Sequence, residues 1–339
     1  MQPDTRQDMQ TRTLGRTGRT VSVVGLGTWQ LGADWGDVSE ADARAVLDAS
    51  REEGVTFFDT ADVYGDGRSE TIIGAFLADN PDAGVTVATK MGRRVDQVPE
   101  NYVLENFRAW TDRSRRNLGV DTLDLVQLHC PPTAVYSDDE LYDALDTLVE
   151  EGAIGAYGVS VEKVEEALQA IARPRVSTVQ MIVNAFRLKP LDEVLPAAAS
   201  SGVGIIARVP LASGLLSGRY DETTTFAADD HRSFNREGSA FDVGETFSGV
   251  DYGTGLVAAK EFGELVRTEA PEGTTSAQAA IAWLWQHDAV SSVIPGARNV
   301  TQARSNAAAG RVPALGPAFD DGVHRIYDQH LRARIHPRW

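Results

Sequence analysis

Cysteine is almost absent from this sequence, and its scarcity narrows the chemistry that the chain can perform. Cys130 is the only cysteine among 339 residues. One thiol cannot form an intramolecular disulfide or supply a cluster of thiolate metal ligands. A reducing compartment therefore suits the chain.

Basic residues are in the minority. The chain has 32 Lys and Arg against 49 Asp and Glu, which gives a formal net charge of -17. An excess of negative charge repels the phosphates of nucleic acids and the surface of anionic membranes. We therefore expect neither as a partner.

Long apolar runs are also missing. No uninterrupted stretch approaches the roughly 20 residues that cross a bilayer as a helix. The first 13 residues are polar and lack the apolar centre of a secretory signal. With 42% hydrophobic residues the chain can still bury a large core. We expect a soluble, cytoplasmic protein.

Several functional motifs are absent as well. The six histidines are scattered, without a second His or a Glu at metal-ligand spacing, so we predict no metal site. No Gly-x-Ser-x-Gly elbow of a serine hydrolase is present. Gly25 and Gly27 resemble the start of a dinucleotide fingerprint, but Gln30 stands where its third glycine belongs. These patterns argue against a metalloenzyme, a serine hydrolase and a Rossmann fold.

The chain does contain a regular alternation of β-type runs and amphipathic segments. Strands are predicted at residues 21–27, 55–59, 85–90, 123–129, 154–160, 176–184, 202–210 and 290–295. Helices are predicted at residues 39–53, 69–77, 99–118, 138–150, 161–172 and 191–200. Such alternation indicates a parallel sheet, and eight units favour a closed (β/α)8 TIM barrel in a single domain.

Two segments depart from the alternation. Residues 213–253 form a polar loop after strand 7 that is too long for an ordinary connection. Beyond Pro313 an extra C-terminal helix is predicted, with an apolar face made by Phe319, Val323, Ile326, Tyr327 and Leu331. We divide the chain into a flexible N-terminal segment (1–12), the barrel domain (13–332) and a C-terminal tail (333–339).

Four polar residues lie at or just after the ends of three predicted strands. Asp59 and Tyr64 follow the second strand, Lys90 ends the third, and His129 ends the fourth. The carboxyl ends of parallel strands in a barrel lie at one face, where active sites gather. Each residue alone has an ordinary structural explanation, but their joint placement indicates a proton-transfer site.

The chemistry of these side chains suggests a role for each. Tyr64 serves as general acid or base, and the ammonium of Lys90 favours its phenolate. Asp59 balances the charge of Lys90, since a buried Lys without a partner loses its proton. His129 donates a hydrogen bond that polarises a substrate carbonyl.

Two later segments could hold a phosphate-bearing cofactor. Residues 213–218 are small and follow a strand directly, which suits close approach to a pyrophosphate. Residues 294–298 end the last strand and lead into a helix, whose N-terminus favours phosphate. Arg298 is the natural partner for a 2′-phosphate.

With these pieces in place, the chain resembles the aldo-keto reductase superfamily over nearly its whole length. The matching motifs are GLGTW (25–29), FFDTADVYG (57–65), VATK (87–90), LDLVQLH (123–129), GVS (158–160), Gln180, LASGLLSG (211–218) and VIPGARNVTQARSN (293–306). The resemblance implies a (β/α)8 barrel that binds NADPH across its carboxyl face. It also implies a catalytic tetrad of Asp59, Tyr64, Lys90 and His129.

The same resemblance implies contacts to cofactor and substrate. The cofactor residues are Gly27, Thr28, Trp29, Asp59, Ser160, Gln180, Arg208, Pro210, Leu211, Gly214, Leu216, Gly218, Gly296, Arg298, Gln302 and Asn306. Trp29, Tyr64 and His129 would contact the substrate. In this set Ser160 and Gln180 hold the nicotinamide amide, and the residues from Gly296 to Asn306 receive the adenosine and its 2′-phosphate.

The chain departs from the family pattern at three positions. Arg208 stands where many members stack an aromatic ring on the nicotinamide, although a planar guanidinium can also stack. Val161 replaces a frequent Asn after Ser160. Gly296 replaces a phosphate-binding Lys found in some members, which leaves more of the 2′-phosphate to Arg298.

Three functions fit these motifs. The leading hypothesis is an NADPH-dependent reductase of aldehydes or ketones, with NAD as a possible second cofactor. The alternatives are a sugar or polyol dehydrogenase that works in the oxidative direction and a cofactor-sensing regulatory subunit. Specificity should lie in residues 29–35, 131–136, 213–253 and the tail from Arg332.

Overall fold

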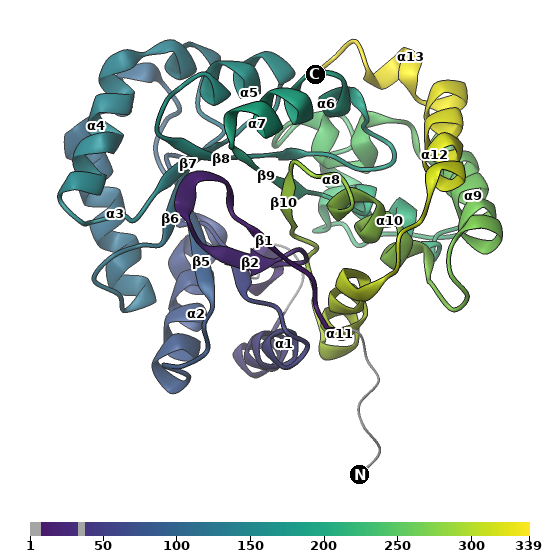
Figure 1. Cartoon of the computed structure of the whole chain (residues 1–339), viewed down its shortest axis with the longest axis horizontal. Coiled ribbons are helices and arrows are strands. Elements are labelled where there is room, and N and C mark those ends of the chain that lie inside the picture. The colour runs from purple at the N-terminus through teal and green to yellow at the C-terminus, as the bar shows by residue number, and fades with distance from the viewer. Residues whose placement is uncertain (1–7, 33–37) are drawn as a thin grey trace.

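The computed structural model describes residues 8–32 and 38–339, and its centre is a parallel eight-stranded barrel (Figure 1). The strands are β3 (Leu26–Gly27), β4 (Phe57–Asp59), β5 (Thr86–Met91), β6 (Leu125–His129), β7 (Tyr157–Ser160), β8 (Val176–Ile182), β9 (Gly204–Arg208) and β10 (Val290–Val293). They are hydrogen-bonded in that order, and parallel bridges from Val24 to Val293 and from Gly27 to Gly296 close the ring. The predicted (β/α)8 barrel is confirmed.

Helices surround the barrel and connect its strands. They are α1 (Glu40–Glu52), α2 (Arg68–Asp79), α3 (Leu104–Leu118), α4 (Asp139–Glu150), α5 (Val164–Ile171), α6 (Lys189–Asp192), α7 (Val194–Ser201), α8 (His231–Phe234), α9 (Tyr252–Glu269), α10 (Ser276–Trp285), α11 (Val300–Ala308), α12 (Pro317–His330) and α13 (Arg332–Ile335). Within the described residues, no helix is both long enough and apolar enough to span a membrane.

The first predicted strand, residues 21–27, is wrong as a single element. Its beginning belongs to β2 (Thr20–Ser22), which pairs antiparallel with β1 (Thr11–Thr13), and only Leu26 and Gly27 join the barrel as β3. The other seven strands lie inside their predicted ranges and are up to four residues shorter, except that β5 extends one residue beyond its range. The β1–β2 pairing also gives regular structure to the end of the segment predicted to be flexible (1–12), of which residues 1–7 lie outside the described part.

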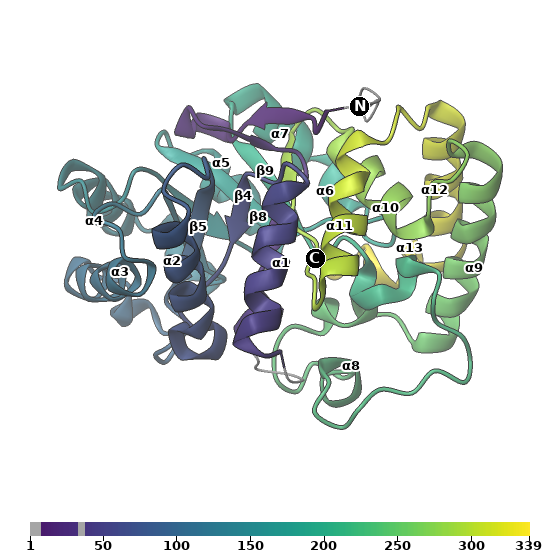
Figure 2. The ribbon, with the colours of Figure 1, turned by 90° about the horizontal axis from the view of Figure 1, so that it is seen from below.

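The β1–β2 hairpin closes one end of the barrel. Leu14 and Val21 from the hairpin are fully buried in a cluster with inward-facing side chains of the strands, namely Phe57, Ala88, Leu125, Ala156, Ile206 and Ile294. Figure 2 shows the hairpin and helix α8 at opposite ends of the barrel. The hairpin fills the end of the barrel where the strands begin, which leaves the carboxyl end for the site.

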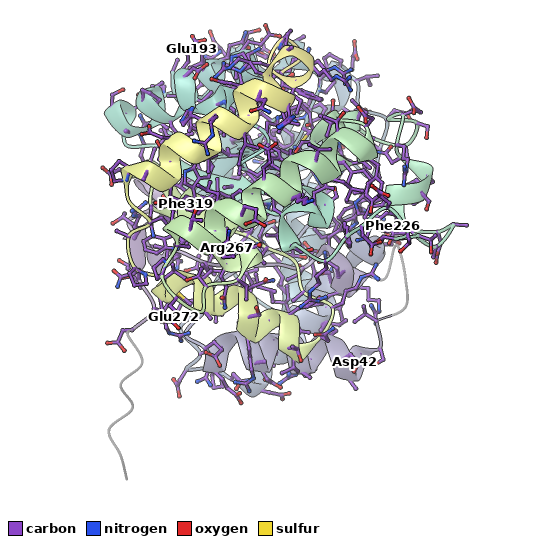
Figure 3. All side chains as sticks on the ribbon, turned by 90° about the vertical axis from the view of Figure 1, so that its right-hand side faces the viewer. Asp42, Glu193, Phe226, Arg267, Glu272 and Phe319 are labelled. Carbon is purple, nitrogen blue, oxygen red and sulfur yellow. The ribbon has the colours of Figure 1, made fainter. Side chains whose placement is uncertain are left out.

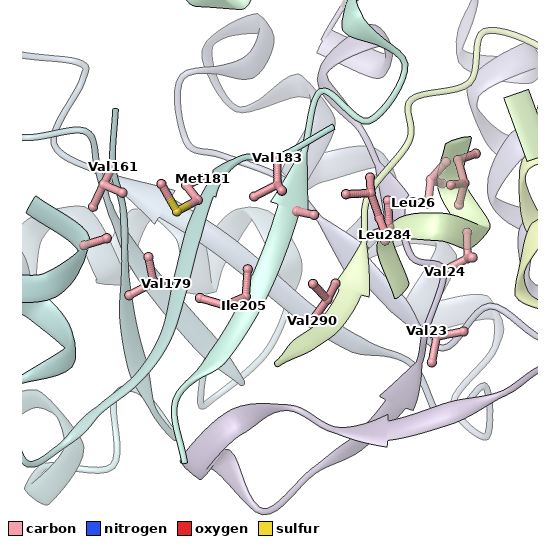
Figure 4. Packing of buried hydrophobic residues seen from close by; sticks show 14 of the residues in the cluster. Val23, Val24, Leu26, Val161, Val179, Met181, Val183, Ile205, Leu284 and Val290 are labelled. Atoms are coloured by element: carbon pink, nitrogen blue, oxygen red, sulfur yellow. The ribbon is translucent and has the colours of Figure 1, made fainter. Parts of the chain in front are cut away.

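A second hydrophobic layer lies between the strands and the helices. Val179, Ile205 and Val290 point outward from neighbouring strands, and Leu284 of α10 packs in the same cluster (Figure 4). These strands are buried on both faces, which explains their nearly continuous apolar sequences.

Helix α12 confirms the predicted C-terminal helix. It packs along α9, and Phe319 of α12 meets Phe262 of α9 edge to face, with 5.9 Å between the ring centroids (Figure 3). Helices α9 and α10 are not among the helices predicted from the sequence. A capping box at the start of α10, in which Thr275 and Gln278 bond reciprocally, was the signal available for that helix.

The C-terminal tail is packed against the barrel. Trp339 is only 6% exposed, its ring lies 4.0 Å from the guanidinium carbon of Arg187, and its indole nitrogen donates to Asp242 at 3.3 Å. The long loop over 213–253 is likewise folded onto the molecule, with short helical turns and buried residues such as Phe247 and Asn235. The tail and the loop therefore stabilise each other.

Replacement of Leu14 by Ala tests the role of the hairpin. The side chain is fully buried at the closed end of the barrel. We expect Leu14→Ala to lower the free energy of unfolding by about 2–5 kcal/mol, because it removes buried methyl groups and leaves a cavity. Urea denaturation measures the change. Val257→Ala, at a position on α9 that is 51% exposed, is the control and should change stability by less than about 0.5 kcal/mol.

Candidate active site

A buried ion pair forms the floor of the candidate site. The ammonium of Lys90 on β5 donates to a carboxylate oxygen of Asp59 on β4, and also to the carbonyl of Thr60 at 2.9 Å. Both side chains are almost completely buried. Burial alone would lower the pKa of Lys90, but the charge of Asp59 and the contact with Tyr64 outweigh it and raise the pKa. Lys90 therefore stays protonated, as predicted.

Two amides complete the hydrogen bonding of Asp59. Its second carboxylate oxygen accepts from the side-chain nitrogen of Gln127 at 3.1 Å and of Gln180 at 2.8 Å. The Gln180 nitrogen also donates to the side-chain oxygen of Gln127 at 3.2 Å. Gln127 is not among the site residues predicted from the sequence. The available signal was a polar residue inside the apolar run of β6.

Tyr64 lies above the Asp59–Lys90 ion pair, on a turn whose backbone requires a glycine. It begins a 3-10 turn in which Gly65, Asp66 and Gly67 all have positive φ. A Cβ on Gly65 would lie 2.2 Å from the carbonyl oxygen of Gly32, so a glycine is required there. The Lys90 ammonium lies 5.2 Å from the centroid of the Tyr64 ring.

The pKa of Tyr64 differs from the expectation drawn from sequence. Lys90 does act to lower the pKa of Tyr64, as expected, but burial of the hydroxyl has the larger effect and raises the pKa above its usual value. The net direction inferred from the ammonium alone is therefore wrong. In the absence of ligand, Tyr64 carries its proton at neutral and mildly alkaline pH.

His129 faces Tyr64 from the end of β6. The two rings are nearly perpendicular, with 6.0 Å between their centroids. Burial, followed by the charges of Arg93, Lys90 and Arg208, lowers the pKa of His129 well below its usual value. Its Nδ1 is buried and has no hydrogen-bond partner within residues 8–32 and 38–339. His129 is therefore a neutral imidazole.

These residues open into a cavity of about 930 Å³ at the carboxyl end of the barrel. The predicted residues that line it are Gly27, Thr28, Trp29, Asp59, Tyr64, His129, Ser160, Gln180, Arg208, Pro210, Leu211, Gly214, Gly296, Arg298, Gln302 and Asn306. Lys90 lies beneath this surface, in contact with Asp59. Two predicted cofactor residues do not line the cavity, since Leu216 is buried in the core and Gly218 ends a 3-10 turn.

The long loop supplies one wall of the cavity. The ring of Trp29 lies 5.5 Å from His231 and 5.8 Å from Phe241, both in the loop, and 6.4 Å from Tyr64. His231 was missed as a wall residue, because nothing in the polar sequence around it distinguishes it. Residues 33–35 of the first predicted specificity loop lie outside the described part of the chain.

Arg208 is held in a network of charges at the end of β9. Its guanidinium pairs with Glu162 at 3.1 Å and with Glu245 of the long loop, and it donates to the carbonyl of Val161 at 3.2 Å. Burial acts to lower its pKa, but the two carboxylates raise it well above the usual value. The guanidinium is therefore a charged plane that borders the cavity, fixed in part by the backbone of Val161.

The opposite end of the cavity has space and donors for phosphate groups. A Cβ on Gly214 would lie 2.3 Å from the hydroxyl of Tyr220, and one on Gly296 would lie 2.2 Å from the amide of Gln30. The lack of a Cβ at both glycines therefore lets Tyr220 and Gln30 pack directly against the backbone. Gln302 accepts from the backbone nitrogen of Arg298 at 2.8 Å, at the start of α11. The cavity is large enough for a dinucleotide, and the side chains of Arg298, Gln302 and Asn306 line this end of it.

Comparison with known proteins agrees with this geometry. The profile of the Aldo/keto reductase family matches residues 23–318. A probable voltage-gated potassium channel subunit beta from Arabidopsis thaliana is 29% identical, over 94% of this chain and 96% of that protein. An L-galactose dehydrogenase from the same plant is 33% identical, over 62% of this chain and 67% of that protein.

Solved structures share the fold. A glycerol dehydrogenase from Gluconobacter oxydans is 29% identical with a TM-score of 0.79, covering 97% of this chain and 98% of that chain. An aldo-keto reductase from Klebsiella pneumoniae in complex with NADPH is 23% identical with a TM-score of 0.69, covering 95% and 96%. Together with the family match over most of the sequence, the barrel and its polar floor establish that this chain belongs to the aldo/keto reductase family of oxidoreductases.

Proposed function

We propose that the chain is an NADPH-dependent reductase that converts aldehydes or ketones to alcohols. The observation that carries this proposal is the placement of Tyr64, with its proton, and neutral His129 above the buried Asp59–Lys90 pair. This arrangement lies in a cavity of about 930 Å³, which has room for both a dinucleotide and a small substrate.

Four side chains have separate roles in proton transfer. His129 donates a hydrogen bond to the carbonyl oxygen and orients it toward Tyr64. Tyr64 then gives its proton to that oxygen as negative charge develops there. The Lys90 ammonium, 5.2 Å from the ring, stabilises the phenolate that remains, and Asp59 keeps Lys90 charged.

The residues at the two ends of the cavity would hold the two ends of the cofactor. When bound, the reduced dinucleotide supplies the hydride. Ser160 and the free oxygen of the Gln180 amide would hold the nicotinamide amide, because the Gln180 nitrogen is already bonded to Asp59 and Gln127. Arg208 would face the ring, and Arg298 would bind the 2′-phosphate. The NADPH complex of the Klebsiella pneumoniae protein supports this cofactor.

A second candidate is a polyol or sugar dehydrogenase. The likeness to a glycerol dehydrogenase and to an L-galactose dehydrogenase favours it. The same residues serve both directions, since a base that accepts a proton from an alcohol is the reverse of the acid described above. Substrate panels with NADP and NAD at alkaline pH distinguish the two.

The third candidate, a cofactor-sensing regulatory subunit, takes its support from the potassium channel beta subunit among the relatives. The intact Asp59, Tyr64, Lys90 and His129 fit catalysis as well as sensing. Tight NADPH binding without reduction of any carbonyl on a broad panel would favour this role over catalysis.

Replacement of Tyr64 by Phe tests the proton donor. We expect Tyr64→Phe to lower kcat for aldehyde reduction by about a hundredfold or more, since general acid catalysis typically contributes that much. NADPH affinity should stay within about twofold. Stopped-flow absorbance and fluorescence titration measure the two. Tyr252→Phe, whose hydroxyl donates to the carbonyl of Asp221 away from the cavity, should leave both unchanged. An undiminished rate in Tyr64→Phe would remove Tyr64 from the mechanism.

The pH dependence of reduction follows from the two shifted pKa values. Reduction needs a protonated Tyr64 and a neutral His129. The pKa of Tyr64 is raised from its ordinary value near 10, so its proton is retained through mildly alkaline pH. The pKa of His129 is lowered from about 6.5, so it is already neutral at pH 6.5. We expect kcat to stay flat from about pH 6.5 to 9. An apparent pKa inside that window for the chemical step would contradict this assignment.

Replacement of Arg298 by Gln tests the cofactor preference. We expect Arg298→Gln to raise the Kd for NADPH at least tenfold, because losing one charge-assisted hydrogen bond weakens binding by about that factor. The Kd for NADH should stay nearly unchanged. Fluorescence titration with each cofactor measures both. Arg304→Gln is the matched control, because Arg304, on the helix α11 that follows Arg298, pairs with Glu52 and Glu53 instead of lining the cavity. Equal losses for NADPH and NADH would contradict a 2′-phosphate contact.

A further inference from the structure

Arg93 lines the cavity and lies directly after Gly92, the residue that follows β5. Gly92 has a φ of 107°, and a Cβ there would lie 3.0 Å from the ring of Tyr102. This left-handed backbone conformation favours glycine. Tyr64 and His129 line the same cavity.

The next residue, Arg94, has a different environment. Its guanidinium pairs with Asp66 at 2.6 Å and does not line the cavity. The two neighbouring arginines thus have separate surroundings, and only Arg93 faces the site.

The guanidinium of Arg93 has no direct partner. It has neither a hydrogen bond nor an ion pair with any residue in the described ranges 8–32 and 38–339. By contrast, Arg208 across the cavity is bound to Glu162 and Glu245. The N–H groups of Arg93 are therefore available to a ligand.

The charges around Arg93 keep it ionised. Burial acts to lower its pKa, but Cys130, Glu245 and Glu162 raise it, while Arg208 opposes them. Both carboxylates are already held by Arg208, so they act on Arg93 only through space. A partly buried guanidinium without hydrogen bonds favours an anion as its ligand.

The position of Arg93 separates it from the residues predicted to bind the cofactor phosphates. In the closed ring of strands β5 lies opposite β9, whereas the predicted pyrophosphate contacts follow β9 and the predicted 2′-phosphate contacts follow β10. Arg93 instead acts electrostatically on His129, a predicted substrate contact, and on the adjacent Cys130, and all three line the cavity. Among the charged groups that act on His129, Arg93 has the largest effect.

We propose that Arg93 binds an anionic group of the substrate, a carboxylate or a phosphate a few bonds from the reacting carbonyl. This inference rests on the proposed function and names its substrate class. Arg93 then orients the substrate so that its carbonyl reaches Tyr64 and His129, while an uncharged carbonyl compound lacks that anchor.

Matched pairs of substrates test the proposal. Succinic semialdehyde is compared with butanal, and glyceraldehyde 3-phosphate with glyceraldehyde, which separates carboxylate from phosphate. In the wild type at least one charged member should have a kcat/KM about tenfold to a hundredfold above its uncharged partner. Arg93→Gln should remove that advantage and leave the uncharged substrates unchanged, whereas Arg93→Lys should retain part of it.

Controls separate binding of the anion from other roles of Arg93. Arg94→Gln removes the same charge one position away and should keep the advantage. NADPH titration verifies that each variant still binds cofactor. Equal kcat/KM values within both pairs in the wild type would overturn the proposal. An equal loss for charged and uncharged substrates in Arg93→Gln would also overturn it, since Arg93 would then act through His129.

A binding measurement keeps this inference distinct from the proposed function. Calorimetry compares 4-hydroxybutyrate with 1-butanol, and glycerol 3-phosphate with glycerol, on the wild type and on Arg93→Gln in the presence of NADP. Anion binding that depends on Arg93 supports the inference even if no aldehyde is reduced, in which case only the proposed function fails. If aldehydes are reduced but neither anion binds through Arg93, the inference fails alone.

Discussion

The structure of the site depends on one buried ion pair. Asp59 and Lys90 are both nearly inaccessible to water, and removing two charges from water is costly unless hydrogen bonds satisfy them. Here Asp59 accepts from Lys90, Gln127 and Gln180, and Lys90 donates also to a backbone carbonyl. These groups come from different strands, so the pair exists only when the barrel is closed and in register. Fold and site therefore form together.

The pair sets the protonation of the residues above it. Tyr64 is buried against an ammonium that would favour its phenolate, yet burial prevails and the proton stays until charge develops on a substrate oxygen. His129 is neutral because burial and three nearby cations all disfavour its charged form. Both groups thus offer N–H or O–H donors at neutral pH. That combination suits stabilisation of an oxyanion, which needs donors that are already in place.

The walls of the cavity are built from a different set of residues. The loop over 213–253 brings His231 and Phe241 against Trp29, and Glu245 against Arg208. These contacts fix one side of the cavity, while Arg93 lines the other side and has no hydrogen-bond or ion-pair partner among the residues that the structure describes. Because loops of related barrels vary while the strands are retained, substrate choice can change without disturbing the floor of the site.

The sequence by itself determined the strand alternation and the placement of Asp59, Lys90 and His129, because parallel strands in a barrel bring their carboxyl ends to one face. It also determined, through its motifs, the family to which the chain belongs. Only the tertiary structure showed that residues 21–27 divide between a hairpin and the barrel, since a local pattern cannot select between two pairing partners. Folding likewise decided the partners of Arg208 and the exposure of Arg93 to the cavity. The charged groups involved lie far apart along the chain, and the electrostatic energy of each guanidinium depends on which residues face it across the closed ring.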